Sequence, residues 1–349
     1  MSDLQPLLNN ETVGKSQITI EDVARQAGVS TSTVSRVLNN SAPVSRVTKK
    51  KILKVIEELH FTPNAMARGL VKKSSKTLGL MIPEITNPFF LELIKGVEDV
   101  ASRHGFSMFL CSTNRVPEKE EYYINEMLER RTNGLMLIST HINNKKMINR
   151  VKKLVEIVSV QSDIEDVDRV DTTDEQGVAS VMEHLIELGH RKIAFVGYRF
   201  DVTSTRNRLL GYQRTLERHS LPLRKEYFNE TDSVENPGYA LTKQLLELKD
   251  RPTAIHCMTD YLAMGAYMAI NESKLRIPAD ISVTGFDNIV ISQLMAPTLT
   301  TVAQPIYQMG ETAAELLIKN IAEGSKSVKQ SIVIPTQLVV RGSSAPPKA

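Results

Sequence analysis

The feature that most constrains this chain is an alternation of short apolar runs with longer amphipathic segments, which continues from Thr77 onward. The runs read LGLMIP, FSMFLCS, GLMLIS, EIVSV, KIAFVG, AIHCM and ISVTGF, and helical segments such as PFFLELIKGVEDVASRHG and EQGVASVMEHLIELGH lie between them. Short buried strands separated by helices of about ten or more residues indicate parallel α/β sheets. About 270 residues are too many for one doubly wound sheet, so we expect two similar lobes.

The second constraint is the distribution of charge along the chain. The net charge is only +3, but Gln17 to Lys76 holds 11 Lys and Arg against 4 Asp and Glu. From Thr77 to Ala349 there are 31 basic and 34 acidic residues. A basic segment on a mildly acidic body is typical of a domain that binds a polyanion, with a solvated charged surface as the alternative.

The basic segment has the pattern of three short helices. Thr19 and Asp22 form a capping box at the start of TIEDVARQAG, and Gly28 ends that helix. Ser30 is expected to cap a second helix, TSTVSRVLNN, and a third helix runs roughly over Ser45–His60. Two short amphipathic helices joined by the turn GVS form a helix-turn-helix.

The second helix is rich in Ser and Thr, which are mediocre helix formers, so we expect packing of Val34, Val37 and Leu38 to hold it in place. Its outer face carries small hydroxyls and Arg36, which suits entry into the DNA major groove and a bidentate contact to guanine. A capped surface helix in a helical domain is the alternative. The expected DNA-contacting residues of the head are Thr19, Ser30, Thr31, Ser32, Thr33, Ser35, Arg36 and Asn39.

The stretch ITIEDVARQAGVSTSTVSRVLNN, with VSRVTKKKILKVIEELHFTPNAMARGL after it, resembles the head of the lactose-repressor/purine-repressor (LacI/GalR) family. LGLMIPEITNPFF, LGHRKIAFVG, TRNRLLGY, PTAIHCMTDYLAMGA, DISVTGFDNI and TLTTVAQP extend the resemblance over essentially the whole chain. It implies a three-helix helix-turn-helix head and a two-lobed, periplasmic-binding-protein-like α/β body of parallel sheets flanked by helices. It also implies three crossings between lobes, which we place near Asp174, Gln304 and Ile334.

The resemblance also implies a domain organisation. It comprises a disordered tail at 1–16, a DNA-binding domain at 17–62, a hinge helix and linker at 63–76, and an effector-binding and dimerisation body at 77–345. Within the body, the N-lobe is expected at about 77–174 and 305–333, and the C-lobe at about 175–304 and 334–345.

The resemblance implies a short hinge helix in PNAMARGL. Eight residues do not hold a helix alone in water, so we expect the hinge to form only when two hinges pair on an operator. The matching positions imply that Leu70 wedges between base steps in the minor groove, with Ala67 and Arg68 lining that groove. Asn64 completes the expected hinge contacts, and a core role for Leu70 is the alternative.

Ligands of open α/β sheets bind at the carboxyl ends of strands, and several polar residues are expected there. The resemblance implies that Arg206 grips the effector and that Asp287 binds it. Arg donors opposite Asp acceptors suit a polyhydroxylated or amide-bearing small molecule. The alternatives are a helix cap for Asp260 and core positions for Phe89 or Phe90. The expected effector-binding residues are Asn87, Phe89, Phe90, Gln161, Arg206, Thr259, Asp260, Asp287 and Gln304.

Two positions depart from the family pattern. Ser233 stands where the family often has an aromatic residue that stacks on the ligand, and Gln161 stands where Asp is common. These departures leave the effector class open among a sugar, a sugar acid and a sugar phosphate.

Together these features predict a sequence-specific transcriptional regulator, a repressor of a catabolic operon, that binds a pseudopalindromic double-stranded DNA operator as a homodimer. The end of the chain, VVRGSSAPPKA, does not match the leucine-repeat helix of the family's tetramers, which favours a dimer. A cytoplasmic location is expected, because there is neither a secretory signal nor an apolar stretch of about 18 residues.

Other function classes fit the sequence less well. Cys111 and Cys257 lie far apart without a CxxC spacing, so no metal site is expected, and no cofactor is expected either. Neither GxGxxG after a strand nor GxxxxGK[ST] occurs, so we do not expect an enzyme. A solute-binding protein or a sugar-metabolising enzyme built on the same α/β body is the alternative.

Overall fold

The computed structural model describes residues 18–39, 41–62, 75–140, 145–198, 202–231, 236–324 and 328–348. The chain divides into two compact units, Met1–Ser75 and Lys76–Ala349, and each is described by itself. The expected tail at 1–16, the hinge residues Asn64, Ala67, Arg68 and Leu70, and Ser233 lie outside the described residues.

The described part of the first unit, which we call the head, contains three helices around a small apolar core. Helix α1 spans Ile20–Ala27, α2 spans Thr31–Asn39 and α3 spans Arg46–Glu58. Because the apolar positions lie along one side of each helix, packing them together leaves the hydroxyl-rich side of α2 outside. The buried core residues are Val23, Ala24, Ala27, Val34, Val37, Ile52, Val55 and Phe61.

The turn between α1 and α2 is defined by caps. The predicted capping box is confirmed, because the Thr19 side chain accepts from the Asp22 amide and the Asp22 carboxylate accepts from the Thr19 amide. Gly28 has φ 60°, a left-handed conformation that glycine adopts without a Cβ clash. The predicted Ser30 cap is also confirmed, since its hydroxyl accepts a hydrogen bond from the Thr33 amide at 3.2 Å.

The second unit, the body, contains two six-stranded sheets in the described part of the chain. The first has the order β11-β5-β4-β3-β1-β2, with β1 at Thr77–Ile82, β2 at Ser107–Ser112, β3 at Gly134–Ile138, β4 at Glu156–Val160, β5 at Asp168–Thr172 and β11 at Ser331–Ile334. The second has the order β12-β10-β9-β8-β6-β7, with β6 at Ile193–Tyr198, β7 at Phe228–Thr231, β8 at Ala254–Cys257, β9 at Ser282–Asp287, β10 at Thr300–Ala303 and β12 at Gln337–Val339. Among these strands only β10 and β12 pair antiparallel.

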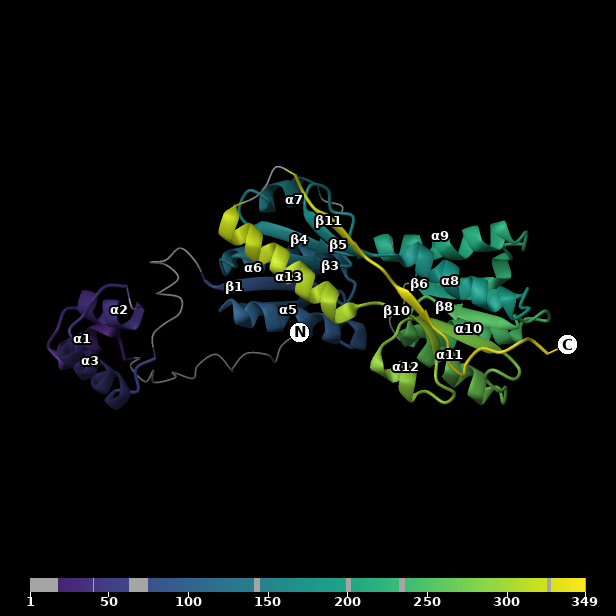
Figure 1. Ribbon diagram of the computed structural model, residues 1–349, viewed down its shortest axis with the longest axis horizontal. Helices are drawn as coiled ribbons and strands as arrows, with labels where there is room; N and C mark the ends of the chain where they lie inside the picture. The colour runs from purple at the N-terminus through teal and green to yellow at the C-terminus, as the bar shows by residue number, and fades with distance from the viewer. Residues whose placement is uncertain are drawn as a thin grey trace, which may run out of the picture. The chain divides into compact units, whose positions relative to one another are not determined.

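Helices flank both sheets, as Figure 1 shows. We call the first sheet with α5 (Pro88–Arg103), α6 (Pro117–Glu129), α7 (Lys145–Val151) and α13 (Ile306–Glu323) the N-lobe. The C-lobe is the second sheet with α8 (Asp174–Glu187), α9 (Thr203–Arg218), the 3-10 turn Lys225–Tyr227, α10 (Pro237–Glu247), α11 (Asp260–Glu272) and α12 (Val290–Leu294). Among the described helices, none combines the length and apolarity needed to cross a membrane.

The described chain passes between the lobes three times. It leaves β5 at Thr173 to begin α8, and it leaves β10 at Gln304 to begin α13. The last passage, between β11 and β12, lies at residues 335–336, within the long yellow segment that joins the lobes in Figure 1. Each lobe is therefore built from segments that are separated in the sequence, which ties the lobes to each other at one edge.

The apolar runs recognised in the sequence all form strands, but five further strands did not stand out. These are β5, β7, β10, β11 and β12, with sequences such as DRVDT, FNET and TTVA. Several of their polar side chains are buried, and hydrogen bonds satisfy many of them, although Asp171 Oδ1 of β5 is buried without a hydrogen-bond partner among the described residues. For example, the Thr301 hydroxyl donates to Asp260 at 2.5 Å, and Asn320 donates to Asp168 at 2.6 Å.

Helices α5 and α13 approach each other closely at two glycines of the N-lobe. A Cβ atom at Gly310 would lie 2.2 Å from the Leu93 carbonyl oxygen, and one at Gly96 would lie 2.2 Å from the Tyr307 carbonyl oxygen. In both cases the obstacle is helix backbone, which cannot rotate away as a side chain can.

Gly310→Ala is therefore expected to lower the free energy of unfolding by about 1–3 kcal/mol, the usual range for overpacking an interior. Thermal unfolding followed by circular dichroism measures the effect. Glu315→Ala, at an exposed position of the same helix, is the matched control and should change stability by less than about 0.5 kcal/mol. Equal Tm values for Gly310→Ala and wild type would contradict this helix packing.

Candidate functional site

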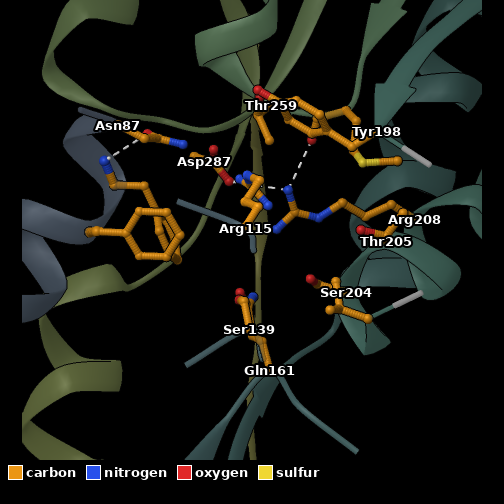
Figure 2. A pocket seen from close by; sticks show the side chains of 14 residues that line it. Asn87, Arg115, Ser139, Gln161, Tyr198, Ser204, Thr205, Arg208, Thr259 and Asp287 are labelled. Atoms are coloured by element: carbon orange, nitrogen blue, oxygen red, sulfur yellow. Dashed lines mark hydrogen bonds and ion pairs between the residues drawn. The ribbon is translucent and has the colours of Figure 1, made fainter. Parts of the chain in front are cut away.

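A pocket lies between the N-lobe and the C-lobe, at the carboxyl ends of strands from both sheets (Figure 2). Open α/β sheets bind ligands at this position. The N-lobe contributes Asn87, Phe89, Phe90, Arg115, Ser139 and Gln161. The C-lobe contributes Tyr198, Val202, Ser204, Thr205, Arg208, Met258, Thr259 and Asp287.

The amino-terminal ends of α5, α9 and α11 meet at this pocket. Asn87 and Thr259 cap α5 and α11 through their side chains. Helix α9 has no side-chain cap, and Ser204 and Thr205 in its first turn line the pocket. Because the first amides of a helix lack intrahelical partners, the open end of α9 offers hydrogen-bond donors and partial positive charge.

Arg208 is a buried cation on the C-lobe side of the pocket. Its Nε donates to Asp174 Oδ1 at 2.8 Å, and its Nη1 donates to Asp287 Oδ1 at 3.3 Å and to the Met258 carbonyl at 2.9 Å. The guanidinium also lies 3.8 Å from the ring centroid of Phe286. Figure 2 shows Arg208 reaching from α9 toward the centre of the pocket. These contacts fix Arg208, which in turn orients Asp287.

The buried carboxyl groups around Arg208 have perturbed acidities. Burial raises the pKa of Asp287 to about 7, although the neighbouring Arg208 opposes the rise. Burial also raises the pKa of Asp174. Asp287 has φ 116°, outside the regions that residues with a Cβ normally adopt, so its backbone is strained. Strain and a shifted pKa at one pocket residue are typical of a functional position.

A chain of hydrogen bonds joins the N-lobe strands to Asp287. Gln161 and Thr172 donate to Gln304 Oε1 at 3.0 and 2.9 Å, and Gln304 Nε2 donates to Asp287 Oδ1 at 2.7 Å. Gln304 lies where the chain passes from β10 to α13. It is therefore placed behind the pocket wall, as a support for Asp287.

Arg115 is a pocket residue that sequence reasoning missed. Its Nη2 donates to Glu84 Oε1 at 2.7 Å, and its guanidinium carbon lies 4.8 Å from the ring centroid of Tyr198. Arg115 and Glu84 belong to the N-lobe and Tyr198 to the C-lobe, so this contact bridges the lobes. The position of Arg115 just after the apolar run FSMFLCS is the signal that could have identified it.

The structure brings most of the predicted effector residues together. Asn87, Phe89, Phe90, Gln161, Thr259 and Asp287 line the pocket, and the two phenylalanine rings are also core residues. Asp260 lies behind the wall, where its carboxylate accepts from the Ile289 amide at 3.0 Å and from a threonine hydroxyl. The residues that sequence reasoning missed are Arg115, Ser139, Tyr198, Val202, Ser204, Thr205, Arg208 and Met258. No cluster of His, Cys, Asp or Glu suited to a metal ion occurs in the described ranges.

The structure corrects the expectation for Arg206. Its side chain is 43% exposed and pairs with Asp163, whereas Arg208 lines the pocket. Two residues along a helix correspond to a rotation of about 200°, so the arginines of TRNR point to nearly opposite sides of α9. The resemblance implied Arg206, whereas the arginine of this segment that lines the pocket is Arg208.

In the head, α2 presents the predicted polar face. Thr31, Ser32 and Arg36 are exposed, whereas Thr33, Ser35 and Asn39 are partly buried. The Ser30 hydroxyl lies 2.8 Å from the hydroxyls of Ser32 and Thr33, and Asn39 donates to the Ser35 carbonyl at 3.0 Å. The outward face of α2 therefore offers hydroxyl groups and one guanidinium, with no carboxylate on the helix.

Known protein families match both the head and the body of this chain. The family model "Bacterial regulatory proteins, lacI family" matches residues 19–64, and a periplasmic binding protein-like domain model matches residues 182–344. Catabolite control protein A of Priestia megaterium is 35% identical over 331 residues, which cover 94% of this chain and 99% of that protein. The chain belongs to the lacI family. The predicted family resemblance, the helix-turn-helix head and the two-lobed body are thereby confirmed.

Solved structures of lacI-family proteins share this architecture. The lac repressor dimer bound to operator and the anti-inducer ONPF superposes with a TM-score of 0.82 at 28% identity, covering 95% of this chain and 100% of that one. A LacI family regulator from Enterococcus faecium with bound ribose has a TM-score of 0.72 at 32% identity, covering 78% of this chain and 100% of that one.

The raised pKa of Asp287 predicts a pH-dependent stability for this lacI-family protein. An unfolded aspartate releases its proton near pH 4, whereas the folded protein holds the proton up to about pH 7. Between these values the folded state binds more protons, so the contribution of Asp287 to stability decreases as pH rises. In thermal unfolding, the Tm of Asp287→Asn relative to wild type should therefore increase from pH 4 to 7 and then level off.

Asp166→Asn is the matched control, because the Asp166 side chain is 84% exposed. The difference in Tm between Asp166→Asn and wild type should not increase from pH 4 to 7. A pH-independent Tm difference for Asp287→Asn would contradict the assignment of this titration to Asp287.

Proposed function

We propose that this protein is a cytoplasmic transcriptional repressor that binds operator DNA through its head and responds to a small-molecule effector bound in its body. The observation that carries the proposal is the combination, in one chain, of a lacI-family head and a polar pocket between two lobes. A catabolic operon is the proposed target. A solute-binding protein or an enzyme built on the same body would not require the basic head.

The proposed DNA contact uses α2 as a recognition helix in the major groove. Exposed Arg36 suits a bidentate contact to guanine, and exposed Thr31 and Ser32 suit base edges or phosphates. Thr19 and Ser30, at the helix starts, are proposed to contact the DNA backbone with Thr33, Ser35 and Asn39. The lac repressor structure with operator supports this arrangement by analogy.

The hinge is proposed to add minor-groove contacts when two copies of the chain meet on a pseudopalindromic operator. Leu70 would act as the wedge between base steps, with Asn64, Ala67 and Arg68 beside it. The related lac repressor is a dimer, which supports the proposed homodimer.

The proposed effector is a sugar or a sugar derivative. Asp287 supplies a carboxylate acceptor, and Ser204, Thr205 and Asn87 supply small polar groups around the same space. Polyhydroxylated ligands need many such donors and acceptors in fixed positions. A lacI-family relative of similar structure holds ribose, which supports this class.

Control is proposed to work by population shift between two relative positions of the lobes. Gln304 accepts a hydrogen bond from Gln161 of the N-lobe and donates one to Asp287 of the C-lobe. The Arg115–Tyr198 contact connects the lobes across the pocket. A ligand that contacts both lobes binds one arrangement better than the other. It therefore shifts the equilibrium by its differential affinity and no more.

The test of DNA recognition uses Arg36→Ala and an operator selected from random duplexes. Loss of one bidentate base contact should reduce discrimination against a substituted base pair by about 1–3 kcal/mol. Lys50→Ala, at an exposed position of α3, is the comparison and should weaken all duplexes nearly equally. The logarithm of the binding constant, measured by fluorescence anisotropy, should fall linearly with the logarithm of the salt concentration. Unchanged discrimination by Arg36→Ala would contradict the assignment of α2.

The test of the pocket compares Asp287→Asn with Arg206→Ala. With the sugar that raises the wild-type Tm most in a thermal-shift screen, Asp287→Asn should weaken binding by about 1.5–3 kcal/mol, as expected for a charged hydrogen bond. Arg206 does not line the pocket, so Arg206→Ala should bind within a few-fold of wild type in calorimetry. The reverse ranking would restore the expectation drawn from the sequence.

A further inference from the structure

The pocket contains a second buried guanidinium, and a carboxylate already neutralises it. Arg115 and Glu84 form an ion pair at 2.7 Å, and their side chains are only 10% and 8% exposed. We propose that Glu84 makes the pocket selective for uncharged effectors, so that sugar phosphates and sugar acids are rejected. This inference rests on the proposed role of the pocket and narrows the ligand class that the sequence left open.

The geometry of Arg115 favours a fixed pair over a free anion receptor. Glu84 follows β1 and Arg115 follows β2, so both are held at the carboxyl edge of neighbouring strands. The Arg115 guanidinium also stacks on the ring of Tyr198 from the opposite lobe. An anion that entered the pocket would meet this guanidinium with Glu84 alongside it, and the two negative charges would repel each other.

The C-lobe side of the pocket repeats the pattern. Arg208 is 5% exposed and pairs with Asp174 and Asp287, whose side chains are 2% and 3% exposed. Among the described residues, these two ion-paired groups contain two guanidiniums and three carboxyl groups. Arg115, Arg208 and Asp287 line the pocket, and Glu84 and Asp174 pair with the two arginines from outside the lining. A buried anion loses its hydration and needs surplus positive charge as compensation, which this set of side chains does not supply.

Two features offset the negative charge at neutral pH, and neither of them supplies a surplus of positive charge. The open end of α9 contributes about half a positive charge. Asp287, with a pKa of about 7, is partly protonated at neutral pH. The same helix end presents Ser204 and Thr205, each 8% exposed, whose hydroxyls bind nothing else within the described ranges. Hydroxyls both donate and accept, so they suit the hydroxyl groups of a neutral ligand.

The experiment on the wild-type protein compares matched neutral and anionic probes. Ribose is compared with ribose 5-phosphate, and glucose with glucose 6-phosphate and gluconate, each by thermal shift at constant ionic strength set with chloride. The expected result is that no anionic probe stabilises the protein more than its neutral parent. Stabilisation by an anionic probe that exceeds the parent, and that Arg115→Gln removes, would overturn the proposal.

The second part uses Glu84→Gln, which retains a hydrogen-bond acceptor for Arg115 but removes the negative charge. Inorganic phosphate should then bind roughly tenfold or more tightly than to wild type, because the negative charge beside Arg115 is removed. Glu118→Gln, at an exposed position of α6, is the matched control and should not gain phosphate binding. A Glu84→Gln protein with wild-type circular dichroism and unchanged phosphate affinity would overturn the proposal.

If Glu84→Gln does not fold, the comparison of neutral and anionic probes on wild type decides alone. Operator selection by the wild-type protein is measured separately. A failure to select any duplex would therefore count against the proposed function, while the charge selectivity of the pocket would still be determined by the phosphate and sugar measurements.

Discussion

The buried ion pairs of Arg208 with Asp174 and Asp287 are the interaction on which the pocket depends. They join the first turn of α8, the middle of α9 and the end of β9 in one rigid group. Removing one partner from such a group leaves an uncompensated buried charge, which is strongly unfavourable. The group therefore fixes the C-lobe wall, and it holds Asp287 in its strained conformation facing the ligand space.

Two sets of contacts connect the lobes near the ion pairs of Arg208. Gln304 extends the hydrogen bonds of Asp287 to Gln161 in the N-lobe, and Arg115 contacts Tyr198 across the pocket. A ligand placed among these residues either changes the Gln304 and Arg115–Tyr198 contacts or binds to residues of both lobes. The fold thus offers a direct physical route from occupancy of the pocket to the relative position of the lobes, which is the quantity an effector has to change.

Much of this architecture was accessible from the sequence, because it follows from periodicity and capping. The apolar runs and the head helices stand out as patterns, and Thr19 and Ser30 cap as expected. The polar strands β5 and β10 were not recognised, because their burial depends on hydrogen bonds to distant segments. Arg115 and Arg208 were missed for a similar reason. Which of several arginines faces a pocket depends on helix phase and lobe contact, and a linear motif does not contain that information.

The central claim is that the pocket and the operator are coupled, and reciprocity tests it most directly. Operator affinity is measured with and without a saturating effector, and effector affinity is measured with and without saturating operator duplex. Thermodynamic linkage requires the two ratios to be equal, and we predict one common factor of about 5–150, corresponding to about 1–3 kcal/mol. An effector that binds the pocket while leaving operator affinity unchanged would contradict the account.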